Sequence, residues 1–205
     1  VYGQDLTDGL GCLKVVYSDN CILTNNNCSA NRYGIILEGS DQNIITRNVC
    51  SHNHDSGIEL YHSNNNKLAD NACSWNYYDG INIYSSDNNT LTGNICLRNC
   101  NRGIGLSFSK NAMVTNNVCS ANNWGIGLSF SSDNTLANNT CSDNSCGIQL
   151  SYSDYNAIMD NHCSQNSGGM VLDSCNNNTV IRNDLTYNSK YGVSLTSSST
   201  YNLIH

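Results

Sequence analysis

A repeat of 22 or 23 residues constrains the fold of this chain more than any other sequence feature. Internal periods of about 20 to 50 residues are typical of solenoids, in which each repeat packs against its neighbours. Leu6 and Leu185 continue a cysteine column at its two ends, which indicates that the column points inward, because Leu and Cys are both readily buried. We therefore expect an inward cysteine ladder. Its members are Cys28, Cys50, Cys73, Cys96, Cys119, Cys141 and Cys163.

Two columns of asparagine accompany the cysteines without an exception. The first column stands two residues before each cysteine position, and the second stands three residues after it. Asn tolerates left-handed corners, and stacked Asn side chains form amide ladders. We therefore expect two structural ladders. They are Asn26, Asn48, Asn71, Asn94, Asn117, Asn139, Asn161 and Asn183, and Asn31, Asn53, Asn76, Asn99, Asn122, Asn144, Asn166 and Asn188.

A glycine follows the second asparagine column and opens a run of alternating apolar residues, as in residues 57–60 and 147–150. Such alternation over a few residues predicts a β-strand. One coil alone cannot bury its inward side chains, so the coils must stack. The predicted fold is all-β, a single-stranded right-handed parallel β-helix of about nine coils with three short strands each. We expect one domain over residues 1–205, either alone or as part of a longer solenoid.

The repeat N-x-C-S-x-N-x₂₋₃-G-I-x-L-x-x-S-x-x-N-x-L-T resembles those of the pectate-lyase-like superfamily, and most closely the NosD-like repeats of surface and periplasmic proteins. The resemblance runs from about Leu6 to Ile204. It implies the β-helix fold. It implies no single activity, because the superfamily contains polysaccharide lyases, hydrolases, epimerases, binding modules, surface-layer components and a periplasmic copper-processing protein.

Charge and hydropathy exclude some partners. The net charge is −7 and the nine basic residues are dispersed, whereas nucleic-acid binding needs clustered Lys and Arg. No stretch reaches the roughly 18 apolar residues that span a bilayer. We expect an extracellular or cell-surface location, with the periplasm as the alternative. Self-association, other surface proteins and polysaccharides are the expected partners.

The cysteines allow three interpretations. A reduced packing ladder is favoured, because in-register neighbours have parallel Cβ vectors that suit a disulfide poorly. Disulfides between adjacent coils are the first alternative. A thiolate chain that binds Cu(I) or zinc is the second, and the NosD resemblance makes copper the metal to consider. We expect no cofactor and no metal site. The remaining cysteines are Cys12, Cys21, Cys100, Cys146 and Cys175.

The candidate ligand-binding residues form a stripe on one strand face and its corner. Glu59 is expected next to Asn82 and Ile36 in the neighbouring coils. The aromatic residues form either a platform for sugar rings or another subunit, or a corner filled by stacked rings. The candidates are Glu59, Tyr61, Tyr84, Phe108, Phe130 and Tyr152.

No residue is assigned a catalytic role. The acidic residues are dispersed, and most are expected to cap turns. His52, His54 and His62 lie on one coil and His162 far from them, so these histidines are interpreted as solvated turn residues.

The leading functional hypothesis is a non-enzymatic structural β-solenoid of the cell surface that assembles into a sheath, layer or filament. The alternative is a carbohydrate-binding or carbohydrate-processing β-helix, which as an enzyme would be a polysaccharide lyase or hydrolase. Copper handling of the NosD type is the second alternative.

Overall fold

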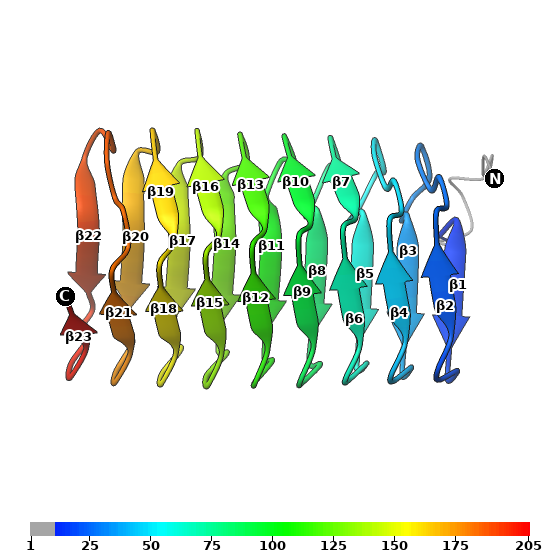
Figure 1. Ribbon diagram of the computed structural model, residues 1–205, viewed down its shortest axis with the longest axis horizontal. Helices are drawn as coiled ribbons and strands as arrows, with labels where there is room; N and C mark the ends of the chain where they lie inside the picture. Colours follow the sequence, from blue (N-terminus) through cyan, green and yellow to red (C-terminus); the bar gives the residue numbers. More distant parts are fainter. Residues whose placement is uncertain (1–10) are drawn as a thin grey trace.

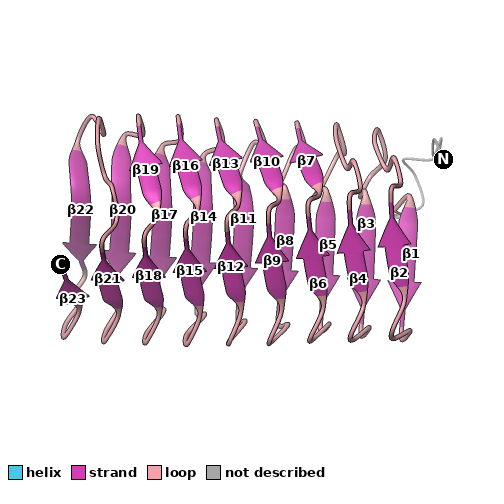
Figure 2. Ribbon diagram, viewed as in Figure 1, coloured by secondary structure: helices cyan, strands magenta, loops and turns pink. Residues whose placement is uncertain are grey.

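The computed structural model describes residues 11–205, and this part of the chain folds into a stack of similar coils. Three parallel sheets run along the stack, and no helix occurs between residues 11 and 205 (Figures 1 and 2). The all-β parallel solenoid predicted from the repeat is confirmed. Leu6, the expected first member of the cysteine column, lies outside the described residues.

Sheet A contains one strand from each of nine coils, paired in sequence order and in parallel. Its strands lengthen from four to six residues at β11. They are β1 Leu13–Val16, β3 Ile35–Glu38, β5 Ile58–Tyr61, β8 Ile81–Tyr84, β11 Arg102–Ser107, β14 Trp124–Ser129, β17 Cys146–Ser151, β20 Gly168–Asp173 and β22 Tyr191–Thr196.

Sheet B also has nine strands, and sheet C has five. Sheet B comprises β2 Ile22–Thr24, β4 Ile44–Thr46, β6 Lys67–Ala69, β9 Thr90–Thr92, β12 Met113–Thr115, β15 Thr135–Ala137, β18 Ala157–Met159, β21 Thr179–Ile181 and β23 Leu203–Ile204. Sheet C comprises β7 Ala72–Ser74, β10 Ile95–Leu97, β13 Val118–Ser120, β16 Thr140–Ser142 and β19 His162–Ser164. Single bridges extend sheet C at both ends, and one of them joins His162 to Asp184.

The core consists of columns in which like residues lie over like residues. Cys73 pairs in register with Cys96, and Cys96 with Cys119. The seven cysteines of the predicted column are fully buried free thiols. The inward Ile and Leu columns of sheet A are equally buried between β3 and β20. Burying whole side chains in this way supplies the main stabilisation, about 1.5–3 kcal/mol for each large aliphatic residue.

The asparagine columns hold the corners together by hydrogen bonds between coils. The Oδ1 atom of Asn94 accepts from the backbone N–H and the Nδ2 of Asn71, at 3.1 and 3.0 Å. Its own Nδ2 donates to the Leu68 carbonyl and to Asn117 Oδ1, both at 3.0 Å. Each amide therefore satisfies a buried backbone group that the turn removes from the sheets. A third asparagine column stands at the corner between sheets A and B, where Ala112 interrupts it and the buried Nδ2 of Asn43 has no hydrogen-bond partner among residues 11–205. It contains Asn43, Asn66, Asn89, Asn134, Asn156 and Asn178.

Two sequence features follow from this construction. The sequence contains no Pro, which suits a stack in which backbone N–H groups donate to the next coil. The corners use left-handed backbone at non-glycine residues, for example φ 55° at Arg98 and φ 52° at Phe108. Within residues 11–205, no helix has the length and apolar character required to cross a membrane.

Candidate functional site

On the outer face of sheet A the residue type changes from coil to coil, whereas on the inner face it repeats. In register along the sheet, the outward residues change from Ile36 to Glu59, Asn82, Gly105 and Gly127. The two glycines leave the sheet surface bare, and the Arg102 side chain lies over both of them. A Cβ atom on Gly105 would come within 2.6 Å of Arg102 Cζ, and one on Gly127 within 2.8 Å of Arg102 Cδ. The space that the two glycines leave is thus occupied by the Arg102 side chain.

An ion pair holds Arg102 in this position. Its Nη2 lies 2.8 Å from Asp79 Oδ2, and its Nε lies 3.1 Å from the same oxygen. The Arg102 backbone N–H donates to Asp79 Oδ1 at 2.8 Å. The Asp79 side chain is fully buried and that of Arg102 is 12% exposed. Burial raises the pKa of Asp79, although the Arg102 guanidinium opposes this increase.

Glu59 is linked to this ion pair through Asn82. Asn82 Nδ2 donates to Glu59 Oε1 at 3.2 Å, and Arg102 Nη2 donates to Asn82 Oδ1 at 3.5 Å. Burial raises the pKa of Glu59 from its ordinary value of 4.5 to about 7. Glu59 therefore exchanges its proton near neutral pH, and it can donate or accept a hydrogen bond toward the outer face. The polar chain spans three consecutive coils.

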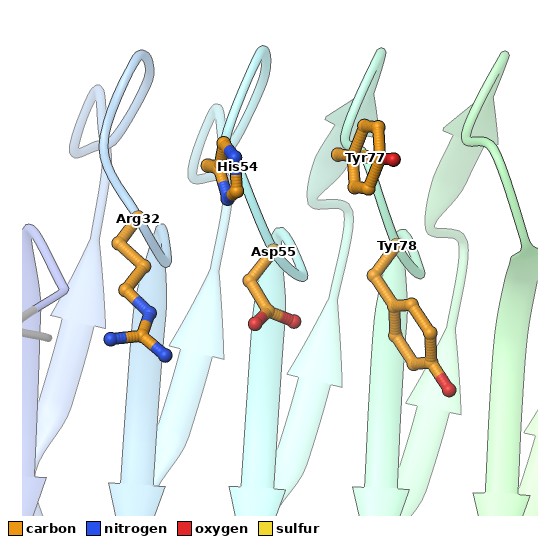
Figure 3. A pocket seen from close by; sticks show the side chains of 5 residues that line it. All are labelled: Arg32, His54, Asp55, Tyr77 and Tyr78. Atoms are coloured by element: carbon orange, nitrogen blue, oxygen red, sulfur yellow. The ribbon is translucent and has the colours of Figure 1, made fainter. Parts of the chain in front are cut away.

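Three hollows lie on this face and along the edge at which the chain enters the strands of sheet A. One of about 400 Å³ contains Arg102, Trp124 and Gln149 in its wall. Another, of about 180 Å³, lies between Lys14 and Glu59. The third measures about 460 Å³ and is drawn in Figure 3. It is lined by Arg32, His54, Asp55, Tyr77 and Tyr78.

The third hollow lies where three successive coils enter sheet A. In Figure 3 the side chains of Arg32, Asp55 and Tyr78 extend side by side from equivalent positions. The rings of His54 and Tyr77 are stacked with centroids 5.5 Å apart. Burial, followed by a hydrogen bond to Asp55, raises the pKa of Tyr33 to about 12. A cationic, an anionic and an aromatic side chain therefore follow one another along this edge.

The predicted aromatic stripe runs along the opposite edge of sheet A. Its ring centroids lie 5.4 Å apart from Tyr61 to Tyr84 and 5.7 Å from Tyr84 to Phe108. The remaining steps, to Phe130 and then Tyr152, are 5.1 and 4.9 Å. Phe108, Phe130 and Tyr152 are 51%, 48% and 56% exposed. The rings therefore pack on one another and also face solvent, so the two interpretations of the stripe are compatible. Its role in ligand binding stays a prediction.

The sequence did not point to Arg102, and Asp79 was interpreted as one of several dispersed carboxylates. Trp124 stood out only as one of the aromatic residues at turns where exposure was expected. One signal was present. Asp79 and Arg102 each stand immediately before the glycine of successive coils, so the register alone places them side by side. The direction of the Arg102 side chain across Gly105 depends on packing, and no sequence pattern reports it.

The three histidines that share one coil, His52, His54 and His62, pack on aromatic rings. His52 stacks on Trp75 with centroids 6.1 Å apart, and His62 lies edge-on to Tyr61 at 4.2 Å. Arg98 covers Trp75 at 4.7 Å from the ring centroid. Among residues 11–205, no three His, Cys, Asp or Glu side chains are grouped so that they could hold a metal ion.

Comparison with known families agrees with this architecture. The model described as "Right handed beta helix region" matches residues 70–205, and that described as "Periplasmic copper-binding protein (NosD)" matches residues 2–117. Each match covers more than half of the sequence, so the chain belongs to the right-handed β-helix and NosD families. The right-handed winding predicted from the repeat is thereby confirmed. No curated protein sequence matches the chain.

Solved structures with the same fold include enzymes that act on carbohydrates. The periplasmic alginate epimerase AlgG has a TM-score of 0.70 and 19% identity, over 90% of this chain and 50% of its own. The A-module of mannuronan C-5 epimerase AlgE6 of Azotobacter vinelandii has a TM-score of 0.76 and 13% identity, over 91% and 63%. The Dettilon tailspike protein has a TM-score of 0.76 and 18% identity, over 92% and 43%.

These similarities concern the fold alone, because identities this low carry no functional information. The chain spans about half the length of the AlgG structure that it matches. The outer face of sheet A must therefore be interpreted from its own residues.

Copper, which the NosD description names, does not fit the described residues. The thiol column has no exposed member. Burial raises the pKa of Cys73 well above its usual value and that of Cys146 to about 12, which keeps these thiols protonated. Cys50 differs, because hydrogen bonds from the thiols of Cys28 and Cys73 lower its pKa, against the increase that burial causes. One favoured thiolate without a path to solvent does not make a site for a soft metal ion.

Proposed function

We propose that this protein is a carbohydrate-binding β-helix that holds an extended polysaccharide along the outer face of sheet A. The observation that carries the proposal is the break in the repeat at this face, where Arg102 lies in a hollow between two aromatic edges. Polysaccharide sites need planar hydrogen-bonding groups beside aromatic surface, and this arrangement supplies both.

The residues suit sugar hydroxyl groups. Glu59, Asn82 and Arg102 form a connected row of donors and acceptors that is already ordered before a ligand arrives, so little entropy is lost on binding. Trp124 and the row from Tyr61 to Tyr152 provide apolar edges on either side. The hollows follow the long axis of the rod, which suits a polymer better than a compact ligand.

The proposed location is extracellular or periplasmic. The NosD match and the AlgG similarity both concern proteins described as periplasmic. Free polysaccharide is a normal partner in either place.

Binding is tested with the full chain against a panel of soluble polysaccharides that contains alginate and neutral glucans, by affinity electrophoresis and calorimetry. Trp124→Ala should weaken binding at least tenfold, because it removes one aromatic edge of the hollow. Trp75→Ala is the matched control, since Trp75 stacks on His52 at another corner. No saturable binding to any polysaccharide, or equal effects of the two substitutions, would contradict the proposal.

The second candidate is the structural, self-assembling solenoid. It is supported by the continuity of the cysteine and asparagine ladders, which are buried and independent of the outer face. Ladders of this kind make a stiff rod whether or not a ligand binds. Electron microscopy of the purified chain would show filaments or sheets for this function, and dispersed single particles for the first.

A further inference from the structure

Three side chains on sheet C form a relay that the polysaccharide groove does not use. They lie at β19 and the coil after it, near the end of the stack that carries β22 and β23 (Figure 1). Ser164 Oγ lies 2.9 Å from His162 Nε2, and His162 Nδ1 lies 2.8 Å from Asp184 Oδ2. We propose that Ser164, His162 and Asp184 are a nucleophile, base and orienting acid that cleave small acyl esters.

The fold fixes this geometry. His162 and Ser164 are two residues apart on one short strand, so both side chains leave the same side of the sheet. The bridge between His162 and Asp184 places the carboxylate one coil further along, at the same height on the strand. Register and strand alternation together therefore align the three groups.

The hydrogen bonds define the proton positions. A carboxylate only accepts, so the Asp184 contact requires the proton of His162 on Nδ1. Nε2 then carries the lone pair, and it accepts the hydrogen bond from the Ser164 hydroxyl. Serine hydrolases on unrelated folds use the same order of contacts, which is recognised by geometry and not by sequence position.

The bonds and protons of the reaction balance with these residues, the ester and water. Ser164 Oγ forms a bond to the ester carbonyl carbon while its proton passes to His162 Nε2. The tetrahedral intermediate expels the alcohol oxygen, which takes that proton as the ester C–O bond breaks. Water then gives a proton to His162 and attacks the acyl carbon. Ser164 Oγ leaves and recovers the proton, so one ester and one water yield one acid and one alcohol.

The surroundings define the class of substrate. Ser164 is 8% exposed, whereas His162 and Asp184 are exposed surface residues. The low exposure of Ser164 favours a small acyl group, such as acetyl, over a bulky one. Ser142 precedes Ser164 in register and its hydroxyl donates to Ser120 at 3.1 Å, so the neighbouring surface is polar. The alcohol part of the ester can be large, because it stays in solvent.

The test uses the full chain in a Cys100→Ser background, because the exposed thiol of Cys100 would itself attack reactive esters. A fluorophosphonate probe should label Ser164, located by peptide mass spectrometry. Hydrolysis of p-nitrophenyl acetate should fall at least tenfold in Ser164→Ala and in His162→Gln, since a positioned general base contributes about a hundredfold or more. Ser74→Ala is the matched control, because Ser74 occupies the same place on β7 two residues after Ala72.

Asp184 acts as a positioning residue. Asp184→Asn should lower kcat and leave KM unchanged, because the amide favours the wrong tautomer of His162, and Asp184→Glu should restore part of the rate. All variants are compared by thermal unfolding. Labelling that is absent from Ser164, or that persists in His162→Gln, would overturn the proposal. So would folded Ser164→Ala protein with the hydrolysis rate of the Ser74→Ala control.

Discussion

The inner and outer faces of sheet A come from the same strands, yet only the inner face repeats. Inward, Ile58, Ile81 and Ile104 are stacked and completely buried. Outward, the neighbouring positions hold Glu59, Asn82 and Gly105. A residue that must match its neighbours above and below is fixed by packing. A residue that faces solvent is free of that requirement, so its identity can change from coil to coil, as it does from Glu59 to Gly105.

The largest expected effect is at the buried ion pair of the outer face. Asp79→Ala should lower the free energy of unfolding by about 4 kcal/mol, because it leaves the guanidinium of Arg102 nearly buried without its partner. Asp160→Ala, which breaks the exposed pair with Arg182, should leave the urea midpoint unchanged. Equal midpoints for the two variants would show that the outer face is as loosely constrained as ordinary surface.

The next effect concerns the inner face. Ile104→Ala should cost about 3 kcal/mol, since it removes buried methyl groups and leaves a cavity between two coils. Gln149→Ala on the outer face of β17 should change the free energy of unfolding by less than about 0.5 kcal/mol. Urea denaturation of both variants measures the contrast between the faces directly. A small loss in Ile104→Ala would mean that the coils close the cavity by moving together.

The smallest of the three effects is the pH dependence that Glu59 contributes. Its pKa is about 7 in the folded chain, above its ordinary value of 4.5, so the folded state binds the proton more tightly. The contribution of protonated Glu59 to the free energy of unfolding is complete below about pH 4.5 and is lost as the pH rises through 7. After allowance for partial exposure, the loss amounts to roughly 2 kcal/mol.

Glu59→Gln should remove this dependence, because the amide does not titrate. Urea midpoints of the two proteins between about pH 5 and pH 8 provide the measurement. Parallel curves for wild type and Glu59→Gln would refute the assignment of a shielded carboxyl group to the outer face.

Much of the fold could be predicted because a solenoid converts sequence spacing into spatial position. Cys73 and Cys96 are 23 residues apart and therefore lie one above the other. The same rule gave the contact of Glu59 with Asn82 on adjacent coils. Little of the candidate site followed, because the rule fixes where a Cα atom lies and not where a long side chain extends.

For two residues, the spacing of the repeat did not predict the side-chain contacts correctly. His162 was interpreted as a solvated turn residue; it is exposed, but it lies on β19 and contacts both Ser164 and Asp184. Asp79 was interpreted as one of several dispersed carboxylates, but it is fully buried and paired with Arg102. Asp184 and Arg102 each lie one coil further along than the residue they contact, and these contacts depend on the rotamers that neighbouring side chains allow.

The sequence by itself determined the coil, its length, its inward columns and its short strands, because each coil can bury its apolar side chains only by lying on an equivalent coil. Only the tertiary structure decided what the outer surfaces present. There the side chains are free of the repeat, and their final positions depend on local hydrogen bonds, charge pairs and the space left by glycine.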